Sequence, residues 1–163
     1  MIVADSAPLI YLSKIGRLDL LKKLYGKILI PQGVWNEVVT EAQGRPGARE
    51  LETGASEGWI KVEKVILPKH LPNEGAEGVD AEVIALAKRI SLPLLTNDRA
   101  LATIARTAGV EAKWLTQAVI EASRTRILST RDARALLRDL VRAGLRIRSE
   151  VLAEAIHMIE DRE

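Results

Sequence analysis

Cysteine and phenylalanine are both absent from this chain of 163 residues, which holds only two histidines, three tryptophans and two tyrosines. Without cysteine there are no disulfides, no thiolate zinc sites and no cysteine nucleophile. Two histidines are too few for an imidazole metal cluster. The scarcity of aromatic rings argues against a platform on which single-stranded bases stack.

Long apolar runs are also missing. No stretch of 18 or more uncharged apolar residues occurs, which excludes a membrane-spanning helix. The first residues lack a basic segment followed by an apolar one, so we expect no signal peptide and a cytoplasmic protein. Hydrophobic residues make up 47% of the chain and charged residues 28%, with a mean hydropathy of +0.03. This composition is typical of one globular domain with a core of its own.

The apolar pattern predicts strands that alternate with helices. We expect strands at 1–4, 27–30, 59–65, 92–96 and 110–113, helices over 8–24, from residue 34, over 80–90 and over 100–108, and loops over 44–47 and 68–78. Repeated strand–helix–strand units pair in parallel. The expected fold class is therefore α/β: a three-layer sandwich with a central parallel sheet over residues 1–115. Residues 116–163 are expected to form an arginine-rich helical extension packed on the same domain.

Four acidic residues stand near the expected strand ends. They are Asp5 and Asp98, which follow strands, Glu37, which lies in the helix after the second strand, and Asp80, which begins the helix before the fourth. Open parallel sheets bind ligands beyond the carboxyl ends of their strands, so we expect the four to meet at one edge. Gathered carboxylates repel one another unless a cation is present, and Mg²⁺ or Mn²⁺ suits an oxygen-only site. Such ions activate water and stabilise a phosphodiester under attack.

Each acid also has a plainer interpretation. Asp5 and Asp98 stand where aspartate is a favoured N-cap, and Glu37 fits a solvated helix position. Asp80 shares its helix face with the apolar residue Ile84, so its carboxylate is expected to point inward. Glu82 shares the opposite face with Arg89 and is expected to lie mostly in solvent.

Several segments together resemble the PIN-domain family, and most closely its prokaryotic VapC-like toxin branch. They are Val3-Ala4-Asp5-Ser6-Ala7-Pro8-Leu9-Ile10, Ile30-Pro31-x-x-Val34-x-x-Glu37, Asp80-Ala81-Glu82-Val83-Ile84-Ala85-Leu86-Ala87 and Leu95-Thr96-Asn97-Asp98-Arg99. The blocks occur in the family's order and cover residues 2 to 113. No single block suffices, but the joint match is specific.

The resemblance implies a ribonuclease that depends on Mg²⁺ or Mn²⁺, forms homodimers and is held by an antitoxin protein. The family's catalytic and metal-binding acids fall on Asp5, Glu37, Asp80 and Asp98, and its supporting polar positions fall on Ser6 and Asn97. Relatives often carry glutamate at the position of Asp80 and a second glutamate two residues later. Glu82 therefore stays an alternative for the third acid.

Other phosphate chemistries fit the residues less well. A haloacid-dehalogenase phosphatase needs a second aspartate at the position of Ala7, and a receiver domain needs an adjacent acidic pair at its first strand. No glycine-rich phosphate loop is present. The alternative from another class is a non-catalytic PIN-like scaffold that binds RNA or protein through its arginine-rich tail.

Positive charge concentrates in the last third of the chain. The net charge is only +2, but residues 124–148 hold eight arginines and two aspartates. Arg134, Arg138 and Arg142 recur at helical spacing opposite an apolar face. They are either the solvated side of an amphipathic helix or an RNA-binding stripe.

Overall fold

A parallel sheet forms the centre of the computed structural model, which describes residues 1–67 and 76–161. The strand order is β3-β2-β1-β4-β5, and every pairing between neighbours is parallel. The strands are β1 (Ile2–Ala4), β2 (Ile28–Pro31), β3 (Ile60–Glu63), β4 (Leu94–Leu95) and β5 (Ala112–Lys113). All three residues of the central strand β1 are fully buried, as expected for a strand covered on both faces.

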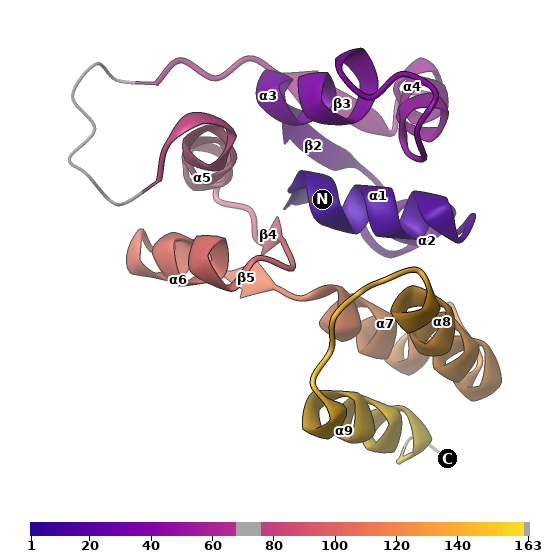
Figure 1. The fold of residues 1–163 in the computed structure, drawn as a ribbon. Coiled ribbons are helices and arrows are strands. Elements are labelled where there is room, and N and C mark those ends of the chain that lie inside the picture. Colours follow the sequence, from indigo (N-terminus) through magenta and orange to yellow (C-terminus); the bar gives the residue numbers. More distant parts are fainter. Residues whose placement is uncertain (68–75, 162–163) are drawn as a thin grey trace.

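Helices cover both faces of this sheet. They are α1 (Ser6–Lys14), α2 (Asp19–Tyr25), α3 (Gln32–Trp35), α4 (Ala48–Ser56), α5 (Gly78–Ile90), α6 (Arg99–Thr107), α7 (Leu115–Arg124), α8 (Thr130–Arg142) and α9 (Ser149–Glu160), with a π-helical turn, η1, at Asn36–Thr40. In Figure 1, α5 and α6 lie on one side of the sheet and α1, α2 and α4 on the other. The expected α/β sandwich with a central parallel sheet is confirmed.

Several boundaries differ from the sequence-based expectation. The helix expected from Pro8 begins at Ser6, because the Asp5 side chain caps it, and the segment 8–24 splits into α1 and α2. The expected strands 59–65, 92–96 and 110–113 are all shorter in the structure. Helix α4 was not anticipated from the pattern. Of the loop expected over 68–78, residues 68–75 lie outside the described residues, and α5 already begins at Gly78.

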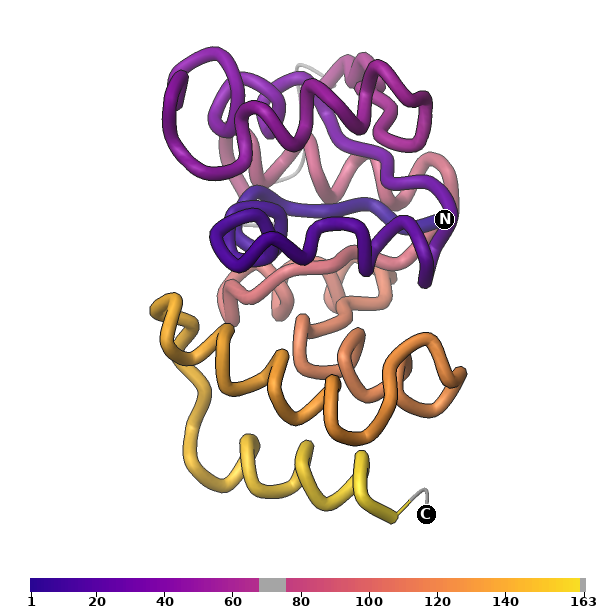
Figure 2. The backbone as a smooth tube through the Cα atoms, turned by 90° about the vertical axis from the view of Figure 1, so that its right-hand side faces the viewer, coloured from indigo at the N-terminus to yellow at the C-terminus, as the bar shows by residue number. Residues whose placement is uncertain are grey.

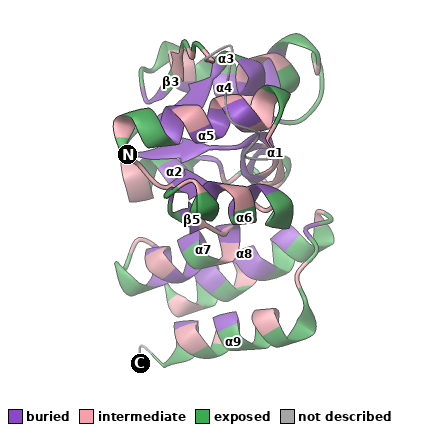
Figure 3. Cartoon of the chain, turned by 90° about the vertical axis from the view of Figure 1, so that its left-hand side faces the viewer, coloured by how far each residue is buried: buried purple, intermediate pink, exposed green. Residues whose placement is uncertain are grey.

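The C-terminal helices pack on the sheet domain through α7. Helix α7 contacts α2, and α8 and α9 pack against α7 and against each other. Figure 3 shows the buried positions of α9 on the side that faces these helices. They include Ala155 and Ile159, which belong to the same continuous apolar cluster as the sheet. No helix in the described part of the chain is long and apolar enough to cross a membrane.

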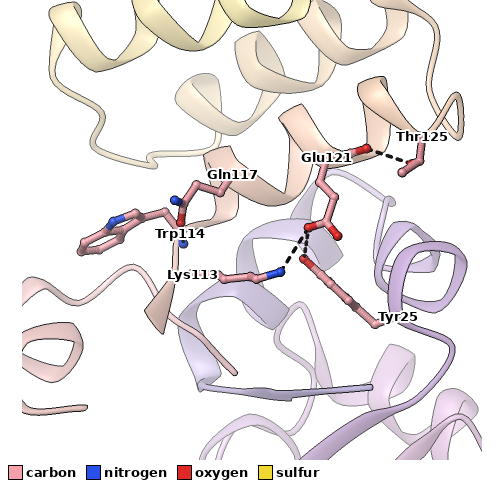
Figure 4. A network of polar contacts seen from close by, with 6 residues as sticks. All are labelled: Tyr25, Lys113, Trp114, Gln117, Glu121 and Thr125. Carbon is pink, nitrogen blue, oxygen red and sulfur yellow. Dashed lines mark hydrogen bonds and ion pairs between the residues drawn. The ribbon is translucent and has the colours of Figure 1, made fainter. Parts of the chain in front are cut away.

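A polar network ties α7 to the sheet (Figure 4). The Glu121 carboxylate accepts a hydrogen bond from the Tyr25 hydroxyl at 3.2 Å and pairs with the Lys113 ammonium at 3.5 Å. Burial, and then the nearby Glu121 charge, raise the pKa of Tyr25 above its usual value, so this hydroxyl stays a donor. At the start of α7, the Gln117 side chain accepts from the Trp114 backbone N–H at 2.7 Å. These contacts fix α7 relative to β5 and α2.

Candidate functional site at the carboxyl edge of the sheet

Asp5 stands directly after the central strand. Its backbone N–H donates to the Leu95 carbonyl at 3.0 Å, which continues the β1–β4 pairing by one residue. One carboxylate oxygen accepts from the Ser6 N–H at 2.8 Å, and the other accepts from the Thr96 hydroxyl at 3.1 Å. The side chain is therefore both an N-cap of α1 and a buried carboxylate at the sheet edge.

Thr96 is a further residue of this edge, and its role does not follow from the sequence pattern. Its side chain is fully buried, and its hydroxyl donates to Asp5 while accepting the backbone N–H of Asp98 at 3.1 Å. One hydroxyl thus links the two turns that carry acids. The available signal was its position: a threonine directly after a buried strand has a hydroxyl that must find a partner.

Ser6 and Glu37 meet across the edge of the sheet. The Ser6 hydroxyl donates to a Glu37 carboxylate oxygen at 2.5 Å. Glu37 is exposed and lies in η1, the π-helical turn that follows α3. Single π-helical turns are rare and frequently occur at functional sites. The hydrogen bond between the two side chains joins the second predicted acid, Glu37, to the predicted supporting serine, Ser6.

Asp98 caps α6, and Asn97 beside it holds the start of α7. The exposed Asp98 carboxylate accepts from the Leu101 N–H at 3.0 Å. The Asn97 side-chain oxygen accepts from the Leu115 N–H at 3.3 Å. Its side-chain nitrogen is buried and has no hydrogen-bond partner among the described residues. The capping interpretation of Asp5 and Asp98 is thus correct, and it is compatible with a second role for both carboxylates.

Asp80 and Glu82 point in different directions from the first turns of α5. Asp80 is half-buried, and its electrostatic neighbours are Asp98 and Glu37. The expectation that Glu82 lies mostly in solvent is wrong: it is half-buried, and its carboxylate accepts the Gly33 N–H at the start of α3 at 2.9 Å. A β-carbon at Gly33 would stand 2.8 Å from that carboxylate oxygen, so glycine permits the approach.

The electrostatics show that the four acids share one field. Burial raises the pKa of Asp5, partly offset by the Ser6 and Thr96 hydrogen bonds, and repulsion from Asp80 and Glu37 raises it further. Burial also raises the pKa of Asp80, and repulsion from Asp98 and Glu37 adds to it. Within the described residues, however, no three acidic or histidine side chains already lie close enough to hold a metal ion. The carboxylates repel one another but do not form a complete metal-binding site.

The raised pKa of Asp80, caused first by burial and then by repulsion from Asp98 and Glu37, predicts a pH-dependent effect of Asp80→Asn on stability without divalent cations. The pKa of Asp80 in the folded protein lies above its usual value of 3.8. The stability that the protonated Asp80 contributes is therefore fully present below that value and is lost as the pH rises through the folded pKa. The Asp80→Asn variant cannot ionise at this position, so it does not lose that stability. Its free energy of unfolding should therefore rise relative to that of the parent between about pH 4 and pH 7.

Urea unfolding of both proteins in chelator across that range measures the difference. Asp139→Asn, at an exposed position on α8, is the matched control and should show no such trend. A constant difference in the free energy of unfolding between parent and Asp80→Asn at every pH would contradict the raised pKa of Asp80.

The predicted arginine stripe lies on α8. Arg134 forms an ion pair with Glu160 of α9 at 3.1 Å, while Arg138 and Arg142 are exposed. The pair favours a structural role for Arg134 in joining two helices. Both interpretations of the stripe, a solvated helix face and an RNA contact, stay predictions.

Comparisons with known proteins identify relatives of this chain. A family model, DUF3368, described as a PIN domain, matches residues 1–161 and thus includes the C-terminal helices. No curated protein matches the chain. One solved structure, a domain of a functionally unknown protein from Methanocaldococcus jannaschii DSM 2661, is 29% identical, covers 70% of this chain and 89% of its own, and has a TM-score of 0.47. Since the family model spans nearly the whole sequence, the chain belongs to the PIN-domain family.

Proposed function

We propose that this protein is a metal-dependent endoribonuclease that hydrolyses RNA phosphodiesters. PIN domains are generally nucleases, so the family supports a hydrolase acting on nucleic acid. The observation that carries the proposal is the placement of Asp5, Glu37, Asp80 and Asp98 at one edge of the sheet, with the pKa of Asp5 and Asp80 raised in part by the other acids. Such a charge arrangement is unfavourable until a cation neutralises it.

The donor set fits a hard divalent cation, because all of its side-chain donors are carboxylate oxygens. Asp5, Asp80 and Asp98 would hold Mg²⁺ or Mn²⁺, with Glu37 as a further ligand and Glu82 as the alternative third acid. When bound, a cation at this edge supplies positive charge for the phosphate and lowers the pKa of an attacking water.

The chain's own residues prepare the carboxylates for this task. Thr96 and the Ser6 N–H hold the two oxygens of Asp5 in one orientation, and the Ser6 hydroxyl holds Glu37. Because Thr96 also accepts the Asp98 N–H, the turns after β1 and β4 keep a fixed spacing. Positioning by neighbouring hydrogen bonds is what a site of this kind requires.

The resemblance to the VapC-like branch extends the proposal to biology. On that basis the enzyme acts as the toxin of a toxin–antitoxin pair, forms a homodimer and is held inactive by an antitoxin protein.

Glu82, through its hydrogen bond to Gly33, has a structural task already, which favours Asp80 as the third acid.

Cleavage assays test the proposal directly. Purified protein with a pool of structured RNAs should produce fragments in Mn²⁺ and none in chelator, and Mn²⁺ should raise the melting temperature because it binds the folded state. A matched DNA pool reports whether the sugar matters. If Mn²⁺ changes neither the melting temperature nor the RNA, the non-catalytic scaffold becomes the better interpretation.

A further inference from the structure

A second feature of the structure is a positively charged groove beside the acidic edge. Its volume is about 640 Å³, and it lies between α6, the start of α7 and the connection from α8 to α9. Four arginines line it: Arg99, Arg106, Arg146 and Arg148. Among the described residues that line the groove, none is acidic.

The four guanidinium groups differ in their partners: Arg106 has contacts within the chain, whereas no hydrogen bond of the other three side chains is seen within the described residues. All four residues are exposed, and within residues 1–67 and 76–161 none of them forms an ion pair. Arg106 lies over the Trp114 ring at 5.7 Å and donates to the Ala112 carbonyl at 3.5 Å. Four like charges around one concave surface repel one another, and a polyanion relieves this repulsion. Guanidinium groups bind phosphates through paired N–H donors.

The connection between α8 and α9 is built to present two of these charges. Leu145 is buried, Arg146 exposed, Ile147 half-buried and Arg148 exposed, so apolar and charged side chains alternate along an extended segment. The Leu145 N–H donates to the Leu140 carbonyl at 3.0 Å, and the Arg148 carbonyl accepts from Leu152 at 3.0 Å. Both ends of the segment are therefore anchored, and its arginines face outward.

The groove adjoins the turn that carries Asp98. Asn97 and Arg99 line it and stand on either side of Asp98 in the chain. Figures 2 and 3 both place the α8–α9 connection on the side where the strands end and α1 begins. If one phosphate of a nucleic acid strand lies at the acids, the strand can continue into the groove, where the neighbouring phosphates would meet the arginines.

We propose that this groove binds the phosphates of the RNA strand next to the scissile bond, with Arg146 and Arg148 as phosphate-binding residues. The inference rests on the proposed ribonuclease function. It gives the C-terminal helices a role in substrate binding, which they perform from a place fixed by the Glu121 network. The described residues that line the groove include no acid, whereas the α8 stripe has Asp139 beside Arg138 in the chain and Glu160 paired with Arg134.

Salt-dependent binding tests the groove. The probe is a fluorescent single-stranded RNA oligonucleotide, titrated in chelator so that no cleavage occurs. Arg146→Ala/Arg148→Ala is compared with Arg138→Ala/Arg142→Ala, which removes the same charge from the exposed face of α8. The groove variant should flatten the plot of log Kd against log salt by about 1.4, from about 0.7 for each lost phosphate contact on a single strand. The α8 variant should keep the parent's slope.

Additional measurements separate an effect on RNA binding from effects on folding and on the cleavage step. Melting temperatures of both variants should match the parent, because the replaced side chains are exposed. Arg146→Lys/Arg148→Lys should restore most of the slope. In Mn²⁺, the groove variant should raise KM with little change in kcat.

Two results would overturn the proposal: an unchanged slope in the groove variant, or a slope lost only in the α8 variant, which would place RNA on α8. Absence of RNA binding by the parent would overturn it as well. If binding follows the groove but no RNA is cleaved in Mn²⁺, the groove stands and the ribonuclease proposal fails.

Discussion

Asp80→Asn should lower the rate of Mn²⁺-dependent RNA cleavage by about 10²-fold or more, whereas Glu82→Gln should lower it less than about fivefold. Asp80 shares an electrostatic field with Asp98 and Glu37, and loss of one ligand removes several kcal/mol of metal chemistry. Glu82 instead accepts the Gly33 N–H. Glutamine keeps a side-chain oxygen for that bond, so it loses only the charge assistance, about 1 kcal/mol.

Initial rates at saturating Mn²⁺ measure both effects. The melting temperature of each variant in chelator serves as the control for folding. An inactive Glu82→Gln beside an active Asp80→Asn would show that the third acid is Glu82 and that our assignment of Asp80 is wrong.

Thr96→Val should destabilise the protein by about 2 kcal/mol and lower its melting temperature by about 4–8 °C. Valine has nearly the same shape but no hydroxyl. The buried Asp5 carboxylate then loses a donor, and the Asp98 N–H loses its acceptor. An unpaired polar group in a buried place is more unfavourable than a missing hydrogen bond in solvent.

Thr96→Ser is the matched variant, since it keeps the hydroxyl and removes only a methyl group, worth about 0.8 kcal/mol. Thermal melts in chelator compare the three proteins, and cleavage assays in Mn²⁺ follow the same order. A valine variant as stable and as active as the parent would mean that Thr96 only fills space.

The sequence by itself predicted the fold class and the approximate place of four acids. Strands and helices carry their own periodicity, so the alternation of apolar residues identified β1, β2, α5 and their neighbours without any long-range information. The positions of Asp5 and Asp98 near the sheet edge could be predicted because Asp5 follows β1 directly and Asp98 stands in the turn after β4. The parallel arrangement followed from the alternation of strands and helices, which fixes the direction of each strand.

Local pattern fails where partners are distant in sequence. Thr96 and Asp5 are 91 residues apart, and only the β1–β4 pairing brings them into hydrogen-bond distance. Periodicity on α5 placed Glu82 away from Asp80 correctly, but it could not show that the start of α3 covers that face. The same limit applies to the arginines, because the sequence does not show which of them form ion pairs and which stay exposed.

Only packing separates Arg134, paired with Glu160, from Arg146 and Arg148 in the groove. The periodicity of a segment depends on its own backbone geometry, so the sequence determined which elements form and which residues end them. What lies opposite each face depends on how helices and strands dock, so the tertiary structure alone decided which side chains meet.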